Sequence, residues 1–252
     1  MIGYNTYGVG PEKVLVFHGW GLDHSAFASM HPALDAETFT FAFMDYRGCG
    51  LSKGQKGCYS IEEIGKDATE LINHLQWQRF HLIGHSMGGM ILQWVAASQS
   101  SFVKSAVAIT PVPACGVPNM EDGRRQFLLK AGESIKGLTA FFAGGTANRH
   151  NIAWAKSIAE MSFANTDHEA YAKYTLAWAD TNFVEKVHGV HVPLKVLVAD
   201  HDTITAEMMK LTILKWFPNS ELEVLNNSGH YPMFEIPINL ATICQDFMTK
   251  HK

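Results

Sequence analysis

The stretch Phe80-His81-Leu82-Ile83-Gly84-His85-Ser86-Met87-Gly88-Gly89-Met90 places a serine between spaced glycines, after a short apolar run and before a helix-like stretch. A strand that turns directly into a helix leaves no room for Cβ atoms two residues on either side of the tip, and glycine fits both positions. The stretch therefore predicts a sharp strand–turn–helix unit with Ser86 exposed at its tip. Free N–H groups at the start of the helix favour an anion at the same point. Because such a turn also suits a purely structural role, partners elsewhere in the chain must decide its function.

The composition is that of a folded globular chain. Of its 252 residues, 47% are hydrophobic and 17% are charged, which excludes a disordered chain and suits one large α/β domain or two small ones. The formal net charge is −4 without a basic cluster, so we expect neither a nucleic-acid partner nor a membrane partner. No apolar run approaches the ~18 residues of a spanning helix, and the N-terminus lacks signal-peptide features, so we expect a cytoplasmic protein.

The cysteines and histidines show no metal-binding or disulfide pattern. The four cysteines, at 49, 58, 115 and 244, are scattered and form no Cys-x-x-Cys pair, so we expect reduced thiols. The 13 histidines also lack a metal-binding spacing. We therefore expect no metal site and no cofactor, and both a monomer and a homodimer stay open.

Short apolar runs alternate with helix-like stretches along most of the chain. Several of these runs are continuous, which is typical of parallel strands buried on both faces. Helices are expected after a capping box that begins at Ser60, from Met87 towards Ala97, and over about Ile238–Met248. The alternation predicts an α/β fold with a mostly parallel sheet flanked by helices, and Ile2–Tyr7 is a candidate antiparallel edge strand. The expected parallel strands are Val14–Phe17, Phe39–Met44, Phe80–Ile83, Ala106–Thr110, Leu194–Ala199 and Leu222–Leu225.

The alternation is interrupted from about Val117 to Lys186, where no strand-like run occurs. This segment is rich in Ala, Phe, Trp and Met, with glycine and proline at both ends. Since it is several times longer than a usual crossover, we expect a helical lid (cap) subdomain at 117–186, inserted after the sixth strand. Ordinary crossover helices are the alternative. The core domain would then comprise residues 1–116 and 187–252.

A serine nucleophile requires a base that takes its proton and a third group that orients the base. In a parallel sheet, these three groups meet only where strands end at the carboxyl edge. Asp200 and Asp202 follow one expected strand, and His230 follows the last, both downstream of Ser86. We predict Ser86 as nucleophile, His230 as base and Asp202 as the orienting acid. Asp200 is the alternative acid, but its place at the strand end favours bonds to turn amides.

The transition state of attack on a carbonyl carries an oxyanion, which preorganised N–H donors stabilise. We expect one donor to be the backbone N–H of Met87, directly after the serine. The second is expected from Trp20 in the loop His18-Gly19-Trp20-Gly21, where glycine allows the backbone to turn towards the serine. A plain loop is the alternative.

Large apolar side chains predict a pocket above the serine. We expect the Trp20 indole to form one wall, with Phe141, Phe142 and Met233 as further substrate-binding residues. For each lid residue, packing in the lid's own core is the competing interpretation. The other large apolar lid residues are Phe127, Leu128, Trp154, Met161, Phe163 and Trp178.

Four motifs, spread over nearly the whole chain, resemble those of the α/β-hydrolase fold family and occur in its expected order. The resemblance implies the α/β-hydrolase fold and places Asp45 and Arg47 in a turn near the active-site edge. The chain also resembles the serine carboxylesterase branch that includes the pimeloyl carrier-protein methyl ester esterase. The lid shows no basic face for an acidic carrier protein, so that substrate is not carried over. The motifs are His18-Gly19-Trp20-Gly21, Asp45-Tyr46-Arg47-Gly48-Cys49-Gly50-Leu51-Ser52, Gly84-His85-Ser86-Met87-Gly88-Gly89 and Gly229-His230-Tyr231-Pro232.

The sequence therefore predicts a serine hydrolase that cleaves carboxylic esters of small to medium acyl or aryl groups through an acyl-enzyme. The resemblance extends to epoxide hydrolases and haloalkane dehalogenases, but these enzymes use an aspartate as nucleophile. Because this chain has Ser86 at that position, neither activity is expected. Lactone hydrolysis, thioester hydrolysis, perhydrolysis and carbon–carbon bond hydrolysis use similar triads and are alternatives. From another class, the alternative is a ligand-binding receptor or regulator that retains the triad.

Overall fold

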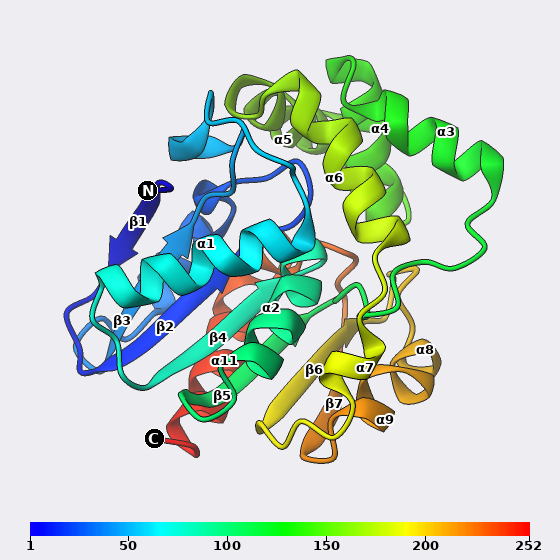
Figure 1. Cartoon of the computed structure of the whole chain (residues 1–252). Coiled ribbons are helices and arrows are strands. Elements are labelled where there is room, and N and C mark those ends of the chain that lie inside the picture. Colours follow the sequence, from blue (N-terminus) through cyan, green and yellow to red (C-terminus); the bar gives the residue numbers. More distant parts are fainter.

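A seven-stranded sheet lies at the centre of the computed structural model, which describes all 252 residues (Figure 1). The strand order is β1-β3-β2-β4-β5-β6-β7; β1 runs antiparallel to β3, and every other neighbouring pair is parallel. The expected mostly parallel sheet is confirmed. The strands are β1 (Tyr4–Tyr7), β2 (Glu12–Phe17), β3 (Phe39–Met44), β4 (Phe80–His85), β5 (Val103–Ile109), β6 (Leu194–Ala199) and β7 (Ser220–Leu225).

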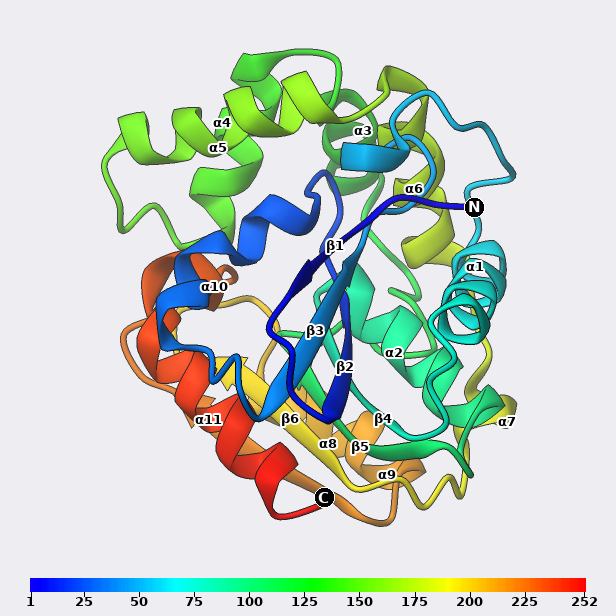
Figure 2. The same cartoon turned by 90° about the vertical axis from the view of Figure 1, so that its left-hand side faces the viewer.

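Helices cover both faces of the sheet (Figure 2). One face carries α1 (Ile61–His74), α2 (Met87–Ser98) and α7 (Val184–Val187), and the other carries η1 (His24–Ala33) and α11 (Pro237–Thr249). All six residues of β4 are buried, which explains why apolar side chains lie on both faces of this strand instead of on one face only. None of the helices combines the length and the apolar character that crossing a membrane requires. The remaining short helices are η2 (Gly50–Ser52), α8 (Ala206–Leu211), α9 (Ile213–Trp216) and α10 (Pro232–Glu235).

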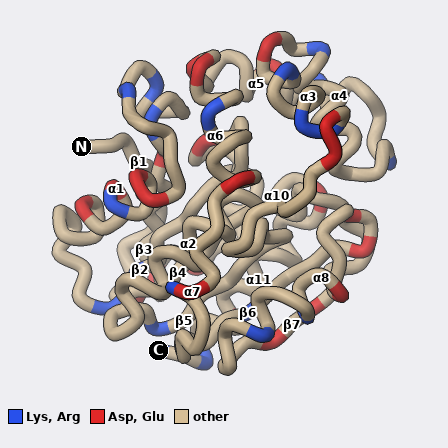
Figure 3. Tube along the Cα trace, turned by 45° about the vertical axis from the view of Figure 1, so that its right-hand side comes forward, with Lys and Arg blue, Asp and Glu red and all other residues tan.

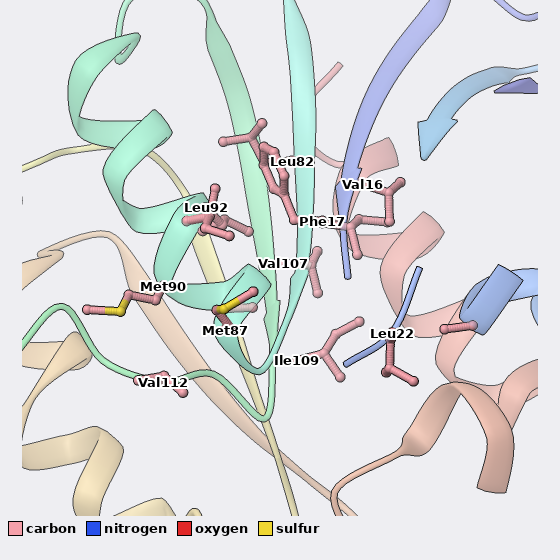
Figure 4. Packing of buried hydrophobic residues seen from close by; sticks show 14 of the residues in the cluster. Val16, Phe17, Leu22, Leu82, Met87, Met90, Leu92, Val107, Ile109 and Val112 are labelled. Carbon is pink, nitrogen blue, oxygen red and sulfur yellow. The ribbon is translucent and has the colours of Figure 1, made fainter. Parts of the chain in front are cut away.

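The core packs α2 against the middle of the sheet (Figure 4). Side chains from β2, β4 and β5 meet the buried face of α2 there, and this packing fixes the turn that joins β4 to α2. The labelled residues are Val16, Phe17, Leu22, Leu82, Met87, Met90, Leu92, Val107, Ile109 and Val112, all buried.

Four helices between β5 and β6 lie over the carboxyl ends of the parallel strands (Figure 1). We call them the lid: α3 (Asp122–Ala131), α4 (Ile135–Gly145), α5 (Ile152–Asn165) and α6 (His168–Asp180). Apart from one isolated bridge between Cys49 and Thr166, this segment has no β-structure. The expected position after the sixth strand is wrong. Since only one strand, β1, precedes β2, the helices follow the fifth strand of the chain.

Candidate active site

Ser86 occupies the sharp turn between β4 and α2. Its backbone angles are φ 54° and ψ −116°, a conformation that residues other than glycine rarely adopt. The Ser86 N–H donates to the Ile109 carbonyl at 2.9 Å, and the Ser86 carbonyl accepts from the Val112 N–H at 3.0 Å. A Cβ atom on Gly84 would lie 2.3 Å from the Gly88 carbonyl oxygen, so glycine is required where strand and helix cross. The structure therefore has the strand–turn–helix unit that the sequence predicts. The expectation that Ser86 is exposed at the tip is wrong: Ser86 is only 8% exposed, because the lid helices lie over this edge of the sheet.

Ser86, His230 and Asp202 form a continuous chain of hydrogen-bonding atoms. Ser86 Oγ lies 2.9 Å from His230 Nε2, and His230 Nδ1 lies 2.7 Å from Asp202 Oδ2. The Asp202 side chain is 1% exposed, and its other oxygen accepts from the Ile204 N–H at 3.2 Å. Because an ionised carboxylate only accepts, Nδ1 donates to Asp202 and leaves Nε2 free to accept the serine proton.

Asp200 is held away from the imidazole by the turn that precedes His230. Its two carboxylate oxygens accept from the N–H groups of Asn227 and Ser228, at 2.9 and 3.1 Å. Burial opposes ionisation, but these two hydrogen bonds outweigh burial and lower the pKa of Asp200 below its usual value. The two aspartates are thus separated as the sequence predicts, with Asp202 beside His230.

Glu235, which the sequence reasoning missed, holds the loop that carries His230. Its carboxylate is 1% exposed and accepts from the backbone N–H groups of Gly229, at 2.9 Å, and Tyr231, at 3.2 Å. These two donors flank His230 in the chain. Glu235 therefore restrains the backbone on both sides of the imidazole.

The same loop is tied to the lid. The His230 N–H donates to the Gly145 carbonyl at 2.8 Å, at the end of α4. Arg149 and His150, from the connection between α4 and α5, lie 3.2 and 2.8 Å from Glu235 Oε2. One buried carboxylate thus joins the histidine loop to the lid.

The expected oxyanion donors lie beside the serine turn. The backbone N–H of Trp20 donates no hydrogen bond to any protein acceptor. Met87 is the first residue of α2, so its N–H has no intrahelical acceptor. The loop that carries Trp20 packs on the turn, since a Cβ on Gly19 would lie 3.3 Å from Ser86 Cβ. Two backbone N–H groups without a protein acceptor therefore lie next to the serine turn, and their role as oxyanion donors stays a prediction.

A cavity of about 540 Å³ lies under the lid and reaches Ser86, Asp202 and His230. Trp20 and Phe141 line this cavity, with their ring centroids 4.6 Å apart in an edge-to-face arrangement. The remaining walls are mainly apolar. The cavity thus offers a mainly apolar site in contact with the serine, the histidine and the acid.

Two expected substrate-binding residues, Phe142 and Met233, do not line the cavity, and both are fully buried. Phe142 packs against Tyr231 with ring centroids 5.3 Å apart. Successive residues of a helix point about 100° apart, and the rotation of α4 directs Phe141 to the cavity and Phe142 to Tyr231. Met233 lies on α10 and belongs to the core instead.

The lid residues divide between the cavity and the lid's packing. Phe127, Leu128 and Trp178 line the cavity, whereas Trp154, Met161 and Phe163 do not. Lining residues that the sequence reasoning did not select come mostly from the loop after β5 and from the segment after β6. They include Val112, Pro113, Cys115, Val117, Pro118, Arg124, Thr203, Ile204, Met208, Thr212 and Tyr231. No local pattern marks them, because their grouping depends on the positions of distant segments.

Asp45 and Arg47 lie in the turn after β3 and do not line the cavity. Asp45 accepts from the N–H groups of His24 and Leu51, at 2.7 and 2.8 Å. Arg47 pairs with Asp67 on α1. Both residues therefore shape the turn, as the resemblance implies.

Comparisons with known proteins agree with this architecture. A sequence model described as alpha/beta hydrolase fold matches residues 13–237. The 3-oxoadipate enol-lactonase 2 of Acinetobacter baylyi is 24% identical over 232 residues, which cover 90% of this chain and 85% of that protein.

Two solved structures superpose closely on the whole chain. A bromoperoxidase from Bacillus anthracis has a TM-score of 0.88 and 19% identity, over 98% of this chain and 94% of that one. An esterase from Exiguobacterium antarcticum has a TM-score of 0.86 and 20% identity, over 98% and 95% of the two chains. At these identities, the likeness shows a shared fold.

Proposed function

The chain belongs to the alpha/beta hydrolase fold family, and on this premise we propose that it is a serine hydrolase that cleaves carboxylic esters of small to medium acyl or aryl groups. One observation carries the proposal. The hydrogen-bonded chain Ser86–His230–Asp202 opens into a mainly apolar cavity of about 540 Å³. A cavity of this size suits one small ligand.

The first half of the reaction acylates the serine. His230 Nε2 takes the hydroxyl proton while Ser86 Oγ attacks the ester carbonyl carbon. The N–H groups of Trp20 and Met87 stabilise the oxyanion of the tetrahedral intermediate. The carbon–oxygen bond to the alcohol then breaks, and His230 gives its proton to the departing alkoxide. Asp202 holds the imidazole tautomer and stabilises its positive charge.

The second half releases the acid. A water molecule attacks the acyl carbon while His230 Nε2 takes one of its protons. The second tetrahedral intermediate collapses with loss of the Ser86 oxygen, which recovers the proton from His230. The products are a carboxylic acid and an alcohol, and the residues return to their starting protonation states.

Lactones are a second candidate substrate class. The similarity to an enol-lactonase over 90% of the chain favours this possibility. The same steps apply to a lactone, except that the leaving oxygen stays attached to the acyl group. The cavity then has to hold both parts of the product until water attacks.

The function is tested with p-nitrophenyl esters and lactones of increasing acyl length. We expect the wild type to turn over short esters, and Ser86→Ala to lower kcat/KM by about 10⁴-fold or more. Ser98→Ala, an exposed serine on the same helix, is the matched control and should retain full activity. A fluorophosphonate probe should label the wild type once, at Ser86.

Other outcomes would reject the hydrolase. Turnover that persists in Ser86→Ala would show that another residue attacks the ester. Stoichiometric labelling of Ser86 without turnover of any ester or lactone would favour a receptor that only binds its ligand.

A further inference from the structure

Arg124, on lid helix α3, is the only lysine or arginine among the residues that line the cavity. The only acidic lining residue is Asp202, which is engaged with His230. The other walls are apolar or uncharged. The cavity therefore presents one fixed positive charge to a ligand and no free negative charge.

The guanidinium of Arg124 has no partner within the protein. It forms no ion pair and no side-chain hydrogen bond, whereas its neighbour Arg125 pairs with Asp180 on α6. In the view of Figure 3, basic and acidic residues are interspersed over the molecule and α3 carries basic residues on the lid. The guanidinium of an arginine has five N–H donors. When it lies beside an apolar cavity and pairs with no carboxylate of the protein, it can pair with a carboxylate of a ligand.

The charge lies at the mouth of the cavity and the reaction centre at its floor. Ser86 and Trp20 are 8% and 4% exposed, whereas Phe127 and Met208 are 43% and 41% exposed. Arg124 is exposed, as Phe127 and Met208 are, and it lies one helical turn before Phe127 on α3. A charged group at this end keeps part of its hydration, while the apolar walls would penalise a charge further inside.

We propose that Arg124 binds the carboxylate at the far end of an acidic ester or lactone. The substrate class is thus a carboxylic ester with an apolar middle and one terminal carboxylate, and this inference rests on the proposed hydrolase function. The carboxylate pairs with the guanidinium fork, and the apolar middle contacts Phe127, Leu128 and Phe141. The ester carbonyl then lies at Ser86.

Matched esters distinguish two roles of Arg124. In the first, the guanidinium binds the substrate carboxylate; in the second, the guanidinium is solvated and only the aliphatic part of the side chain covers apolar surface. The substrates are p-nitrophenyl monoesters of dicarboxylic acids and the corresponding monocarboxylic esters of equal length. Arg124→Gln should lower kcat/KM for the acidic esters roughly fivefold, mainly through KM, and leave the neutral esters within about twofold. Added salt should reduce this difference. Arg124→Lys should retain part of the kcat/KM for acidic esters that Arg124→Gln loses.

Arg79→Gln is the matched control. Arg79 is exposed and immediately precedes β4, so it lies at the opposite edge of the sheet from Ser86 while the change in net charge is the same. This variant should treat acidic and neutral esters as the wild type does. An equal loss in the two arginine variants would mean that net charge alone acts.

The failures of the two proposals are distinguishable. If Arg124→Gln leaves the ratio of acidic to neutral turnover unchanged, the carboxylate site is refuted while the hydrolase stands. If the wild type hydrolyses no ester, the carboxylate site is tested by the melting temperatures of the wild type and of Arg124→Gln, each measured with and without added dicarboxylate. Stabilisation of the wild type but not of Arg124→Gln would support the site, and equal behaviour would refute it.

Discussion

At the scale of single residues, the reactive oxygen is held by a strained backbone. Ser86 has a positive φ, which costs on the order of 1–3 kcal/mol for a residue with a side chain. Hydrogen bonds to Ile109 and Val112 maintain this conformation, and the buried contacts of α2 support it. Because the turn is rigid, it holds Ser86 Oγ at 2.9 Å from His230 Nε2, whereas a flexible loop would place the oxygen at many positions.

The two aspartates after β6 give the sharpest test at this scale. Asp202→Asn should lower kcat by about 10³- to 10⁴-fold, because the amide no longer fixes the tautomer that leaves Nε2 basic. Asp200→Asn should lower kcat less than about tenfold, since Asp200 accepts from the turn amides of Asn227 and Ser228 and makes no hydrogen bond to His230. Steady-state kinetics on a p-nitrophenyl ester measures both. The reverse ranking would assign the orienting role to Asp200.

At the scale of elements, the site depends on how the histidine loop is joined to α10 and to the lid. Glu235 of α10 accepts from amides on both sides of His230 and also contacts Arg149 and His150. The lid and the base therefore share one buried anion. A displacement of the connection between α4 and α5 would act on the position of the imidazole.

Glu235→Gln tests this link. The amide preserves the shape but offers only one acceptor oxygen and no charge, so we expect a loss of about 2 kcal/mol in the free energy of unfolding. Because the base is less well held, kcat should fall at least about tenfold with little change in KM. Urea unfolding and ester kinetics measure the two effects.

Glu207→Gln on α8, where the side chain is exposed, is the control and should change neither quantity. A loss of stability in Glu235→Gln with unchanged kcat would limit Glu235 to a structural role.

At the scale of the whole molecule, helices on both faces bury the sheet and with it several histidines. His18 and His85, near the active site, and His81, on β4, are almost fully buried, and burial lowers the pKa of each. For His81, the effect of burial outweighs hydrogen bonding to Glu12, so the pKa is about 4. These side chains are therefore neutral in the folded protein near pH 7.

The stability of the fold should consequently fall in mild acid. In the unfolded chain a histidine has a pKa of about 6.5, so below that pH the unfolded state binds more protons and stability decreases towards the folded pKa. Between pH 7.5 and pH 5, His81 alone should account for about 1–2 kcal/mol of this loss.

Urea unfolding at several pH values, with His81→Gln as the comparison, measures this share. The variant should show a smaller decrease between the same pH values. An identical pH dependence in the two proteins would contradict the assignment.

Much of the architecture followed from short-range pattern. Continuous apolar runs marked β3 and β6 with their observed limits, because burial on both faces leaves a signature within a few residues. The three residues Ser86, Asp202 and His230 could also be predicted in this chain order, because the carboxyl ends of parallel strands lie at the same edge of the sheet. The long helical segment without strands was also predicted, but its position after the fifth strand was misjudged, and a lid subdomain with limits 117–186 stays a prediction.

The walls and supports of the site followed from packing between distant segments. Phe141 faces the cavity and its neighbour Phe142 does not, because the rotation of α4 about its axis depends on everything that contacts α4. Glu235 meets Arg149 across 86 positions of chain, and Arg124 reaches the cavity only because α3 folds over the sheet edge. The chemistry of the serine is thus encoded locally. The shape and charge of the space above the serine arise only once the lid is folded over the sheet.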